Sequence, residues 1–217
     1  MKKVEARRLL ATVGILLAAT WVISLGIHSK SGVSHVDQSV WRFFVDHGSS
    51  RVHSLARFIT SFGVLGFLGP VCVVLGSLLW VKTHSAAVSI APWISVMVCG
   101  EIVSILKRAT NVPRPPLQYQ VMQIRNPSFP SGHTADTTAF VVSLLLIMWC
   151  VLEMPRPVKN WVTVVGTSTF LAMGLTRLLL NVHWLSDVLA GWCVGAAIGL
   201  TVTGLLLALR PQKLSTQ

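Results

Sequence analysis

Charged residues are scarce in this sequence of 217 residues. They make up 12% of the chain, against 53% hydrophobic residues, and only seven of them are Asp or Glu. A soluble domain usually carries about 25% charged residues, so this chain has too few charges to cover a surface that faces water. The composition therefore argues against an ordinary soluble protein and favours one that is surrounded by a lipid bilayer.

Patterns that bind metal ions are also missing. The four cysteines lie in separate apolar runs without a CxxC pair, which argues against a disulfide framework and against a zinc site. No cluster of Asp and Glu suits magnesium, and no HExxH-like pattern suits zinc. We therefore expect a protein that uses no metal ion and no other cofactor.

Basic residues outnumber acidic ones, by 18 Lys and Arg to seven Asp and Glu, which gives a formal net charge of +11. Nucleic-acid-binding modules concentrate such residues in a basic stripe on a soluble domain. Here they stand singly or in pairs between apolar runs, so we expect no nucleic acid as a partner. Membrane lipids and phosphate groups fit this distribution better.

Six apolar stretches are long enough, at about 20 residues each, to cross the hydrocarbon core of a bilayer. Spanning segments of this length must be helical because lipid cannot satisfy open backbone polar groups. The first stretch has a longer apolar core than a signal peptide, so we expect it to be retained. The sequence predicts an all-α, six-transmembrane-helix bundle that forms a single domain over residues 1–217. The predicted spans are 9–27, 58–81, 86–106, 134–154, 161–180 and 188–209.

The segment between the first two spans, residues 29–57, is too polar to cross the membrane. On a helix its residues Val36, Val40, Phe43 and Phe44 would share one apolar face. This pattern predicts a helix that lies in the membrane interface and anchors the bundle there.

An even number of spans places both termini on one side of the membrane and the loops after spans one, three and five on the other. Each side carries nine Lys and Arg, but those beside the termini are concentrated in short segments close to span ends. Such concentrations are typical of the cytoplasmic side. We therefore predict cytoplasmic termini, and an outer face that carries the loops after spans three and five.

Those two loops hold an unusual set of polar residues, in the segments 107–115, 128–133 and 176–187. The set combines three cations, the start of a helix, two histidines and a carboxylate on one side of the membrane: Lys107, Arg114, Arg177, Ser131, Gly132, His133, His183 and Asp187. Phosphoryl transfer needs such groups. Cations and backbone N–H groups neutralise the phosphate oxygens, one imidazole can attack phosphorus, and another can protonate the leaving oxygen.

Local patterns support this interpretation. Ser131 is a candidate N-cap, Gly132 lets the backbone approach a ligand closely, and the exposed N–H groups of a first helical turn bind anions. His183 and Asp187 are four residues apart, so on a helix they would share a face. A carboxylate bonded to one imidazole nitrogen fixes the tautomer and makes the other nitrogen a better nucleophile.

Three segments, KRATNVPRP, SFPSGH and TRLLLNVHWLSD, resemble in order and spacing the signature motifs of the type 2 phosphatidic acid phosphatase superfamily. The resemblance implies a membrane-bound phosphatase with His183 as the nucleophile, Asp187 orienting it and His133 as the general acid. It also implies that the remaining members of the set hold the phosphate oxygens: Lys107, Arg114, Ser131, Gly132 and Arg177. The chain departs from the family pattern at Thr176, which replaces a serine but keeps the hydroxyl.

The substrate implied by the resemblance is a lipid phosphate: undecaprenyl pyrophosphate, phosphatidylglycerol phosphate or phosphatidic acid. A lipid transporter or flippase that uses the same basic site for headgroups is the alternative, although it would distribute polar groups through the membrane depth. A vanadate-dependent haloperoxidase shares the oxyanion pocket but is soluble. Five further polar residues receive no role from the sequence: Glu101, Arg108, Asn111, Arg125 and Asp136.

Overall fold

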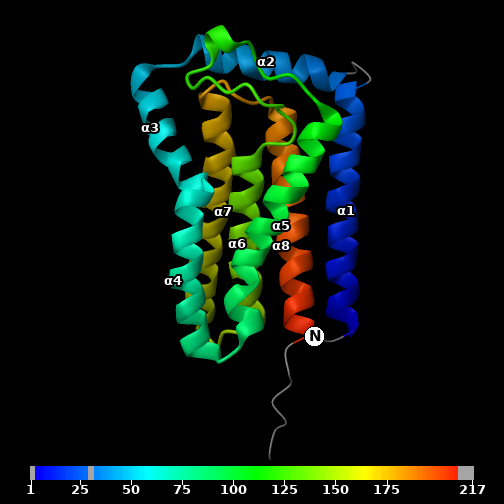
Figure 1. Cartoon of the computed structure of the whole chain (residues 1–217), viewed down its shortest axis with the longest axis vertical. Coiled ribbons are helices and arrows are strands. Elements are labelled where there is room, and N and C mark those ends of the chain that lie inside the picture. The colour runs from blue at the N-terminus through cyan, green and yellow to red at the C-terminus, as the bar shows by residue number, and fades with distance from the viewer. Residues whose placement is uncertain (1–2, 29–31, 210–217) are drawn as a thin grey trace, which may run out of the picture.

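The structure, a computed structural model, describes residues 3–28 and 32–209 of the chain. Within these ranges every regular element is a helix, and the long helices run side by side in a bundle (Figure 1). The elements are α1 (Lys3–His28), α2 (Gly32–Asp46), α3 (Ser50–Thr60), the 3-10 turn η1 (Ser61–Gly63), α4 (Leu65–Thr83), α5 (Ala86–Thr110), the 3-10 turn η2 (Leu117–Tyr119), α6 (Gly132–Cys150), α7 (Arg156–Leu179) and α8 (Leu185–Ala208).

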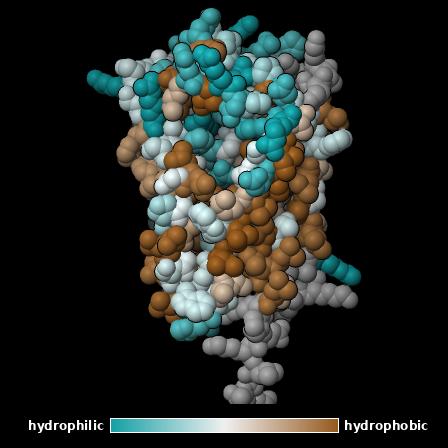
Figure 2. Space-filling view, viewed as in Figure 1, coloured by the Kyte–Doolittle hydropathy of each residue, from teal (hydrophilic) through white to brown (hydrophobic). Residues whose placement is uncertain are grey.

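Six helices in the described part of the chain are long and apolar enough to cross a membrane: Arg7–Gly26 of α1, and α4, α5, α6, α7 and α8 over their full lengths. Large apolar side chains point outward along them; Val81, Val165 and Leu205 are 70%, 60% and 62% exposed. Hydrophobic residues gather along the length of the bundle, and hydrophilic ones at the end that carries α2 (Figure 2). The predicted all-α bundle of six spans is thus confirmed, and the chain is an integral, multi-pass membrane protein.

The second predicted span, 58–81, begins too early. Its first residues belong to α3 and to η1, and the spanning helix α4 starts only at Leu65. The hydroxyl of Ser61 donates to the carbonyl of Phe58 at 2.7 Å, where the helix tightens into the 3-10 turn. Hydropathy cannot detect this break, because apolar residues continue on both sides of it.

The parity argument agrees with the structure. The described ends of α1 and α8, at Lys3 and Ala208, lie at one end of the bundle (Figure 1). Helix α2 and the connections from α5 to α6 and from α7 to α8 lie at the opposite end. All three motif segments therefore end on one face. Which face the cytoplasm contacts remains a prediction.

Helices α6 and α8 form the closest pair in the bundle, and a glycine stripe on α8 explains why. A Cβ added at Gly195 would overlap the carbonyl oxygen of Ala135, and one at Gly191 would lie 2.9 Å from that of Ser131. Gly199, one turn further, repeats this close approach. Small residues at every fourth position let two membrane helices pack backbone to backbone. The pairing brings the N-terminal ends of α6 and α8 together, where two of the motifs lie.

Helix α2 lies across the end of the bundle (Figure 1), and a buried carboxylate fixes it there. Asp37 accepts hydrogen bonds from the backbone N–H of Ser186 at 2.8 Å and from its hydroxyl at 2.7 Å. On the predicted apolar face, Val36 and Phe43 are exposed. Asp37 is a contact that the sequence did not reveal, and an interfacial position for α2 remains a prediction.

Candidate active site

His183 lies in the short connection between α7 and α8 and is almost completely buried. Its Nδ1 atom is 3.0 Å from Oδ2 of Asp187. The same carboxylate oxygen accepts the backbone N–H of Trp184 at 2.8 Å and a short hydrogen bond from the hydroxyl of Ser128. An Nδ1–H that donates to this carboxylate leaves Nε2 as the unprotonated nitrogen.

The predicted contact between His183 and Asp187 is therefore present, but the predicted reason for it is wrong. His183 precedes α8 instead of sharing a helical face with Asp187, which stands in the first turn of that helix. The carboxylate folds back over the helix start to the N–H of Trp184. This capping arrangement, and not helical spacing, brings the imidazole and the carboxylate together.

Arg114 lies against the other side of the imidazole. Its Nη1 atom is 2.9 Å from Nε2 of His183 and donates to the carbonyl of Val182 at 2.6 Å. Nε donates to the carbonyl of Asn126 at 2.8 Å, and Nη2 to the amide oxygen of the same residue at 2.9 Å. Because these bonds hold the planar guanidinium from several directions, Arg114 keeps a fixed position beside Nε2.

Lys107 and Arg108 were predicted in a loop, but α5 continues to Thr110 and contains both in its last turn. The ammonium group of Lys107 donates to the carbonyls of Pro127 at 2.6 Å and Ser128 at 2.9 Å. Two of its three N–H groups thus hold the segment that leads to α6, and the third is available for an anion.

Arg177, in the last turn of α7, has a side chain that is only 1% exposed. Its Nη1 atom donates to the hydroxyl of Thr60 at 2.6 Å, at the end of α3. Its buried Nε–H has no hydrogen-bond partner in the described part of the protein. A buried guanidinium N–H without a partner is costly, and a phosphate oxygen would satisfy it.

Ser131 occupies the predicted N-cap position of α6, but its side chain does not cap the helix. The hydroxyl bonds to the hydroxyl of Thr134 at 2.8 Å, and the backbone N–H donates to the carbonyl of Asp187 at 3.0 Å. This second bond ties the start of α6 to the start of α8. Gly132 and His133 follow in the first turn of α6, whose N–H groups have no partner within the helix.

His133 lies on the side of the site formed by η1. A Cβ added at Gly63 would be 3.3 Å from Cδ2 of His133, so the ring packs against this turn. His133 is also within electrostatic reach of Arg177, Arg114 and Lys107. The site is therefore formed by four segments: the end of α5 with the connection that follows it, the start of α6, the α7–α8 connection and the α3–η1 segment.

Burial and neighbouring charges keep the imidazole of His183 neutral. Burial, followed by the positive charges of Arg114, Arg177 and Lys107, lowers the pKa of His183 well below its usual value. Burial also lowers the pKa of Arg114, to about 10, although the Asp187 carboxylate opposes this shift. At neutral pH the site thus combines a neutral imidazole with a charged guanidinium.

The structure brings together all eight residues that the sequence singled out: Lys107, Arg114, Ser131, Gly132, His133, Arg177, His183 and Asp187. Sequence reasoning missed three others, Ser128, Asn126 and Thr60. Ser128 is the first residue of the segment SFPSGH, and Asn126 lies two residues before it. Thr60 lies far from every motif, and no signal in the sequence distinguished it.

The polar residues without a predicted role differ in their surroundings. Glu101 is exposed on α5, and the exposed Arg108 donates to the hydroxyl of Ser104. Asn111 has a positive φ of 46° and ends α5. Asp136 points toward α5, where its Oδ1 lies 3.9 Å from a Cβ added at Gly100.

A family model described as the PAP2 superfamily matches residues 88–210, which include all three motifs. A lipid A 1-phosphatase from Porphyromonas gingivalis is 39% identical over 72 residues, which cover 33% of this chain and 15% of that protein. An undecaprenyl-diphosphatase from Sulfolobus acidocaldarius is 31% identical over 71 residues, covering 33% of this chain and 30% of the relative. The chain thus matches less than a third of the length of either relative.

Among solved structures, a transmembrane PAP2 type phosphatidylglycerolphosphate phosphatase from Bacillus subtilis superposes with a TM-score of 0.84. The superposition covers 93% of this chain and 99% of that one, at 19% sequence identity. At this identity the likeness establishes a common fold.

Proposed function

Because the chain belongs to the PAP2 superfamily, we propose that it is a lipid phosphatase that transfers the phosphoryl group of its substrate to His183 and then to water. The observation that carries this proposal is the position of His183, whose Nδ1 faces Asp187 at 3.0 Å and whose Nε2 faces Arg114 at 2.9 Å. An imidazole held in this way has one tautomer and a nucleophilic nitrogen beside a phosphate-binding cation.

Phosphate binding would use the cations and the start of α6. An oxygen held by Arg114 lies beside Nε2 of His183, and another can reach the unpaired Nε–H of Arg177. Lys107 and the first-turn N–H groups that begin at Gly132 complete the set. These groups offset the charge that the phosphate keeps through the reaction.

In the first step Nε2 of His183 attacks phosphorus, and the bond from phosphorus to the leaving oxygen breaks. The leaving oxygen takes a proton from His133, which therefore acts as the general acid. Asp187 stabilises the imidazole ring while it carries the phosphoryl group, through the Nδ1–H bond.

In the second step a water molecule attacks the phosphorus of the phosphohistidine, and the P–N bond breaks. His133, now without its proton, takes one from this water. Inorganic phosphate leaves, and both histidines return to their starting protonation states.

The distribution of buried charge favours catalysis over transport. Among the described residues, the charged side chains that are most deeply buried are Asp37, Arg177 and Asp187, and all three lie at the loop end of the bundle. A transporter would distribute such groups along a path through the membrane.

The substrate we propose is a lipid whose phosphate or diphosphate lies at the membrane surface, with undecaprenyl pyrophosphate and phosphatidylglycerol phosphate preferred over phosphatidic acid. The relatives are named as phosphatases of lipid A, undecaprenyl diphosphate and phosphatidylglycerolphosphate. We place the site on the outer face of the membrane, from the density of basic residues beside the termini.

The test is phosphate release by the purified chain in detergent micelles, measured across these three lipids. We expect at least one of them to be hydrolysed to inorganic phosphate. If none releases phosphate above the level of a blank without protein, the proposed activity is wrong.

Chelation of metal ions should leave the activity intact. Within the described residues, no group of three or more His, Cys, Asp or Glu could hold a metal ion, and three cationic side chains can neutralise the phosphate instead. Phosphate release with excess EDTA should therefore match release without it. Loss of activity in EDTA and its recovery with Mg²⁺ would contradict this prediction.

Replacing Arg114 by glutamine should move the acid limb of the pH profile to higher pH. The Arg114 charge helps to lower the pKa of His183. Removing this charge should therefore raise the pKa of His183 toward 6.5. The imidazole then becomes protonated, and inactive as a nucleophile, at a higher pH than in the wild-type protein. The measurement is kcat/KM against pH, which reports groups of the free enzyme.

The substrate phosphate titrates in the same way with the wild-type protein and with Arg114→Gln, so it does not contribute to the difference between their two pH profiles. Arg125→Gln, an exposed arginine in the same loop, is the matched control and should keep the wild-type profile. An acid limb that stays in place or moves to lower pH in Arg114→Gln would show that Arg114 does not depress the pKa of His183.

A further inference from the structure

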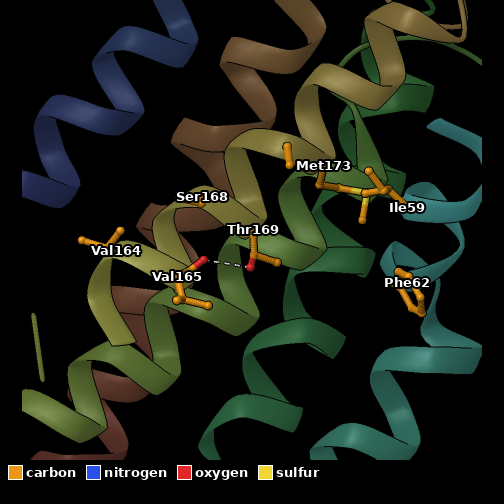
Figure 3. Close-up of a pocket in the computed structure, with 8 residues that line it drawn as sticks. Ile59, Phe62, Val164, Val165, Ser168, Thr169 and Met173 are labelled. Carbon is orange, nitrogen blue, oxygen red and sulfur yellow. Dashed lines mark hydrogen bonds between the residues drawn. The ribbon is translucent and has the colours of Figure 1, made fainter. Parts of the chain in front are cut away.

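An apolar groove of about 390 Å³ runs along the outside of the bundle between α7 and the α3–η1 segment (Figure 3). Ile59 and Phe62 form one side, and α7 residues from Val164 to Met173 form the other. The hydroxyl of Thr169 donates to the carbonyl of Val165 at 2.9 Å, so even this polar side chain turns its hydrogen into its own helix (Figure 3).

The groove follows the helix axis. Val165 and Met173, which both line it, are eight residues apart on α7, a rise of about 12 Å. Since α7 spans the membrane, the groove extends from the level of the candidate active site toward the middle of the bilayer. That direction suits a hydrocarbon chain whose phosphate lies at the membrane surface.

Met173, the groove-lining residue of α7 that is nearest to Arg177 in the sequence, has a buried side chain. Its sulfur lies 3.9 Å from the hydroxyl of Thr60, which also receives the N–H of Arg177. A Cβ added at Gly63 would meet Met173 at 2.7 Å and His133 at 3.3 Å. One flexible side chain thus lies between the groove and the residues proposed to bind and protonate the substrate.

We propose that this groove holds the hydrocarbon tail of the lipid phosphate, with Met173 as the movable inner wall against which the tail segment nearest the phosphate rests. The inference rests on the proposed function, since it takes the occupant to be the substrate. Met173 lines the groove and also contacts Thr60 beside Arg177, so the groove adjoins the phosphate-binding side of the site, which favours this occupant over a bystander lipid or another protein helix. Methionine suits such a wall because its unbranched chain adapts to different shapes.

Filling the groove tests the proposal. Ala172, which lines it beside Met173, is replaced by tryptophan, and Leu171→Trp serves as the matched control, because Leu171 is exposed on the same helix but does not line the groove. Each variant is assayed with a long-chain lipid phosphate in micelles and with 4-nitrophenyl phosphate, which has no tail.

For Ala172→Trp we expect kcat/KM for the lipid to fall about tenfold or more, because the displaced tail no longer holds the phosphate in line with the nucleophile. Hydrolysis of 4-nitrophenyl phosphate should stay within about twofold, and Leu171→Trp should leave both substrates nearly unchanged. An equal loss for both substrates, or no loss for the lipid, would overturn the groove proposal. If the wild-type protein hydrolyses neither substrate, the proposed function itself fails.

A labelling experiment gives an independent answer if Ala172→Trp does not fold. A lipid phosphate with a photoreactive diazirine in its tail is bound to the wild-type protein and irradiated, and labelled peptides are identified by mass spectrometry. We expect label at Ile59, Phe62 or Val165. Label confined to other surfaces of the bundle would reject the groove as the tail site.

Discussion

Replacing His183 by alanine is expected to lower phosphate release from the lipid substrate by about 10⁴-fold or more. The substitution removes the imidazole nitrogen that is held beside Arg114 in a ring oriented by Asp187. Binding of the phosphate by the remaining cations should persist, so the loss should fall mainly on kcat and less on KM. Initial rates measured over a range of lipid concentrations separate these two terms.

The variant should still fold, because Asp187 keeps its hydrogen bonds from Ser128 and from the N–H of Trp184. Thermal unfolding in detergent checks this directly. His47→Ala is the matched control: His47 is exposed, its Nδ1–H donates to the carbonyl of Phe43 in its own turn, and its ring stacks on that of Phe43. We expect full activity from this control, and activity retained by His183→Ala would remove the nucleophile from the proposed mechanism.

Asp187→Asn should lower kcat by about 10³- to 10⁴-fold while preserving the fold. The amide oxygen can still accept from Trp184 and Ser128, but it carries no charge to stabilise the imidazole when the ring holds the phosphoryl group. The opposite amide rotamer, in which the NH₂ group takes the place of Oδ2, would lose the bonds from Trp184 and Ser128 and would favour the His183 tautomer with the proton on Nε2, which cannot attack.

Asp37→Asn is the control for this substitution. It also converts a buried carboxylate to an amide, and it contacts Ser186, next to Asp187 in the chain. Any loss caused by disturbing the start of α8 should appear in both variants, whereas the loss caused by the imidazole should appear only in Asp187→Asn. Equal losses in the two variants would indicate that Asp187 acts by holding the helix start.

The sequence predicted the spans and the motif residues because both depend on local chemistry. Hydrocarbon thickness sets the length of an apolar helix, and parity then places Lys107, Arg114 and His183 on one face. The ends of the spans were less accurate. Hydropathy does not distinguish a spanning helix from apolar residues in a neighbouring helix, and so it joined Phe58 to α4 across the turn at Gly63.

Contacts between distant segments could not be predicted from one sequence. Thr60 receives Arg177 from 117 positions away, and Asp37 reaches Ser186 across 149 positions. Neither residue belongs to a recognisable pattern. The glycine stripe on α8 was not predicted either, although it explains why the starts of α6 and α8 meet.

Two motif residues lie where the sequence placed them but are held by other contacts. Ser131 stands at the N-cap of α6, yet its hydroxyl bonds to Thr134. Asp187 meets His183 through the cap of α8 instead of along a shared helical face. Spacing predicts which side chains can meet, but the backbone path between them decides how.

The central claim is that His183 carries the phosphoryl group during turnover. Its most direct test is rapid acid-free quenching of the purified protein with a ³²P-labelled lipid phosphate, followed by digestion and mass spectrometry. We predict a phosphoramidate that is stable to alkali and labile to acid, on the peptide that contains His183, and no such label in His183→Ala. A label on another residue, or steady turnover with no label on the protein, would contradict the account.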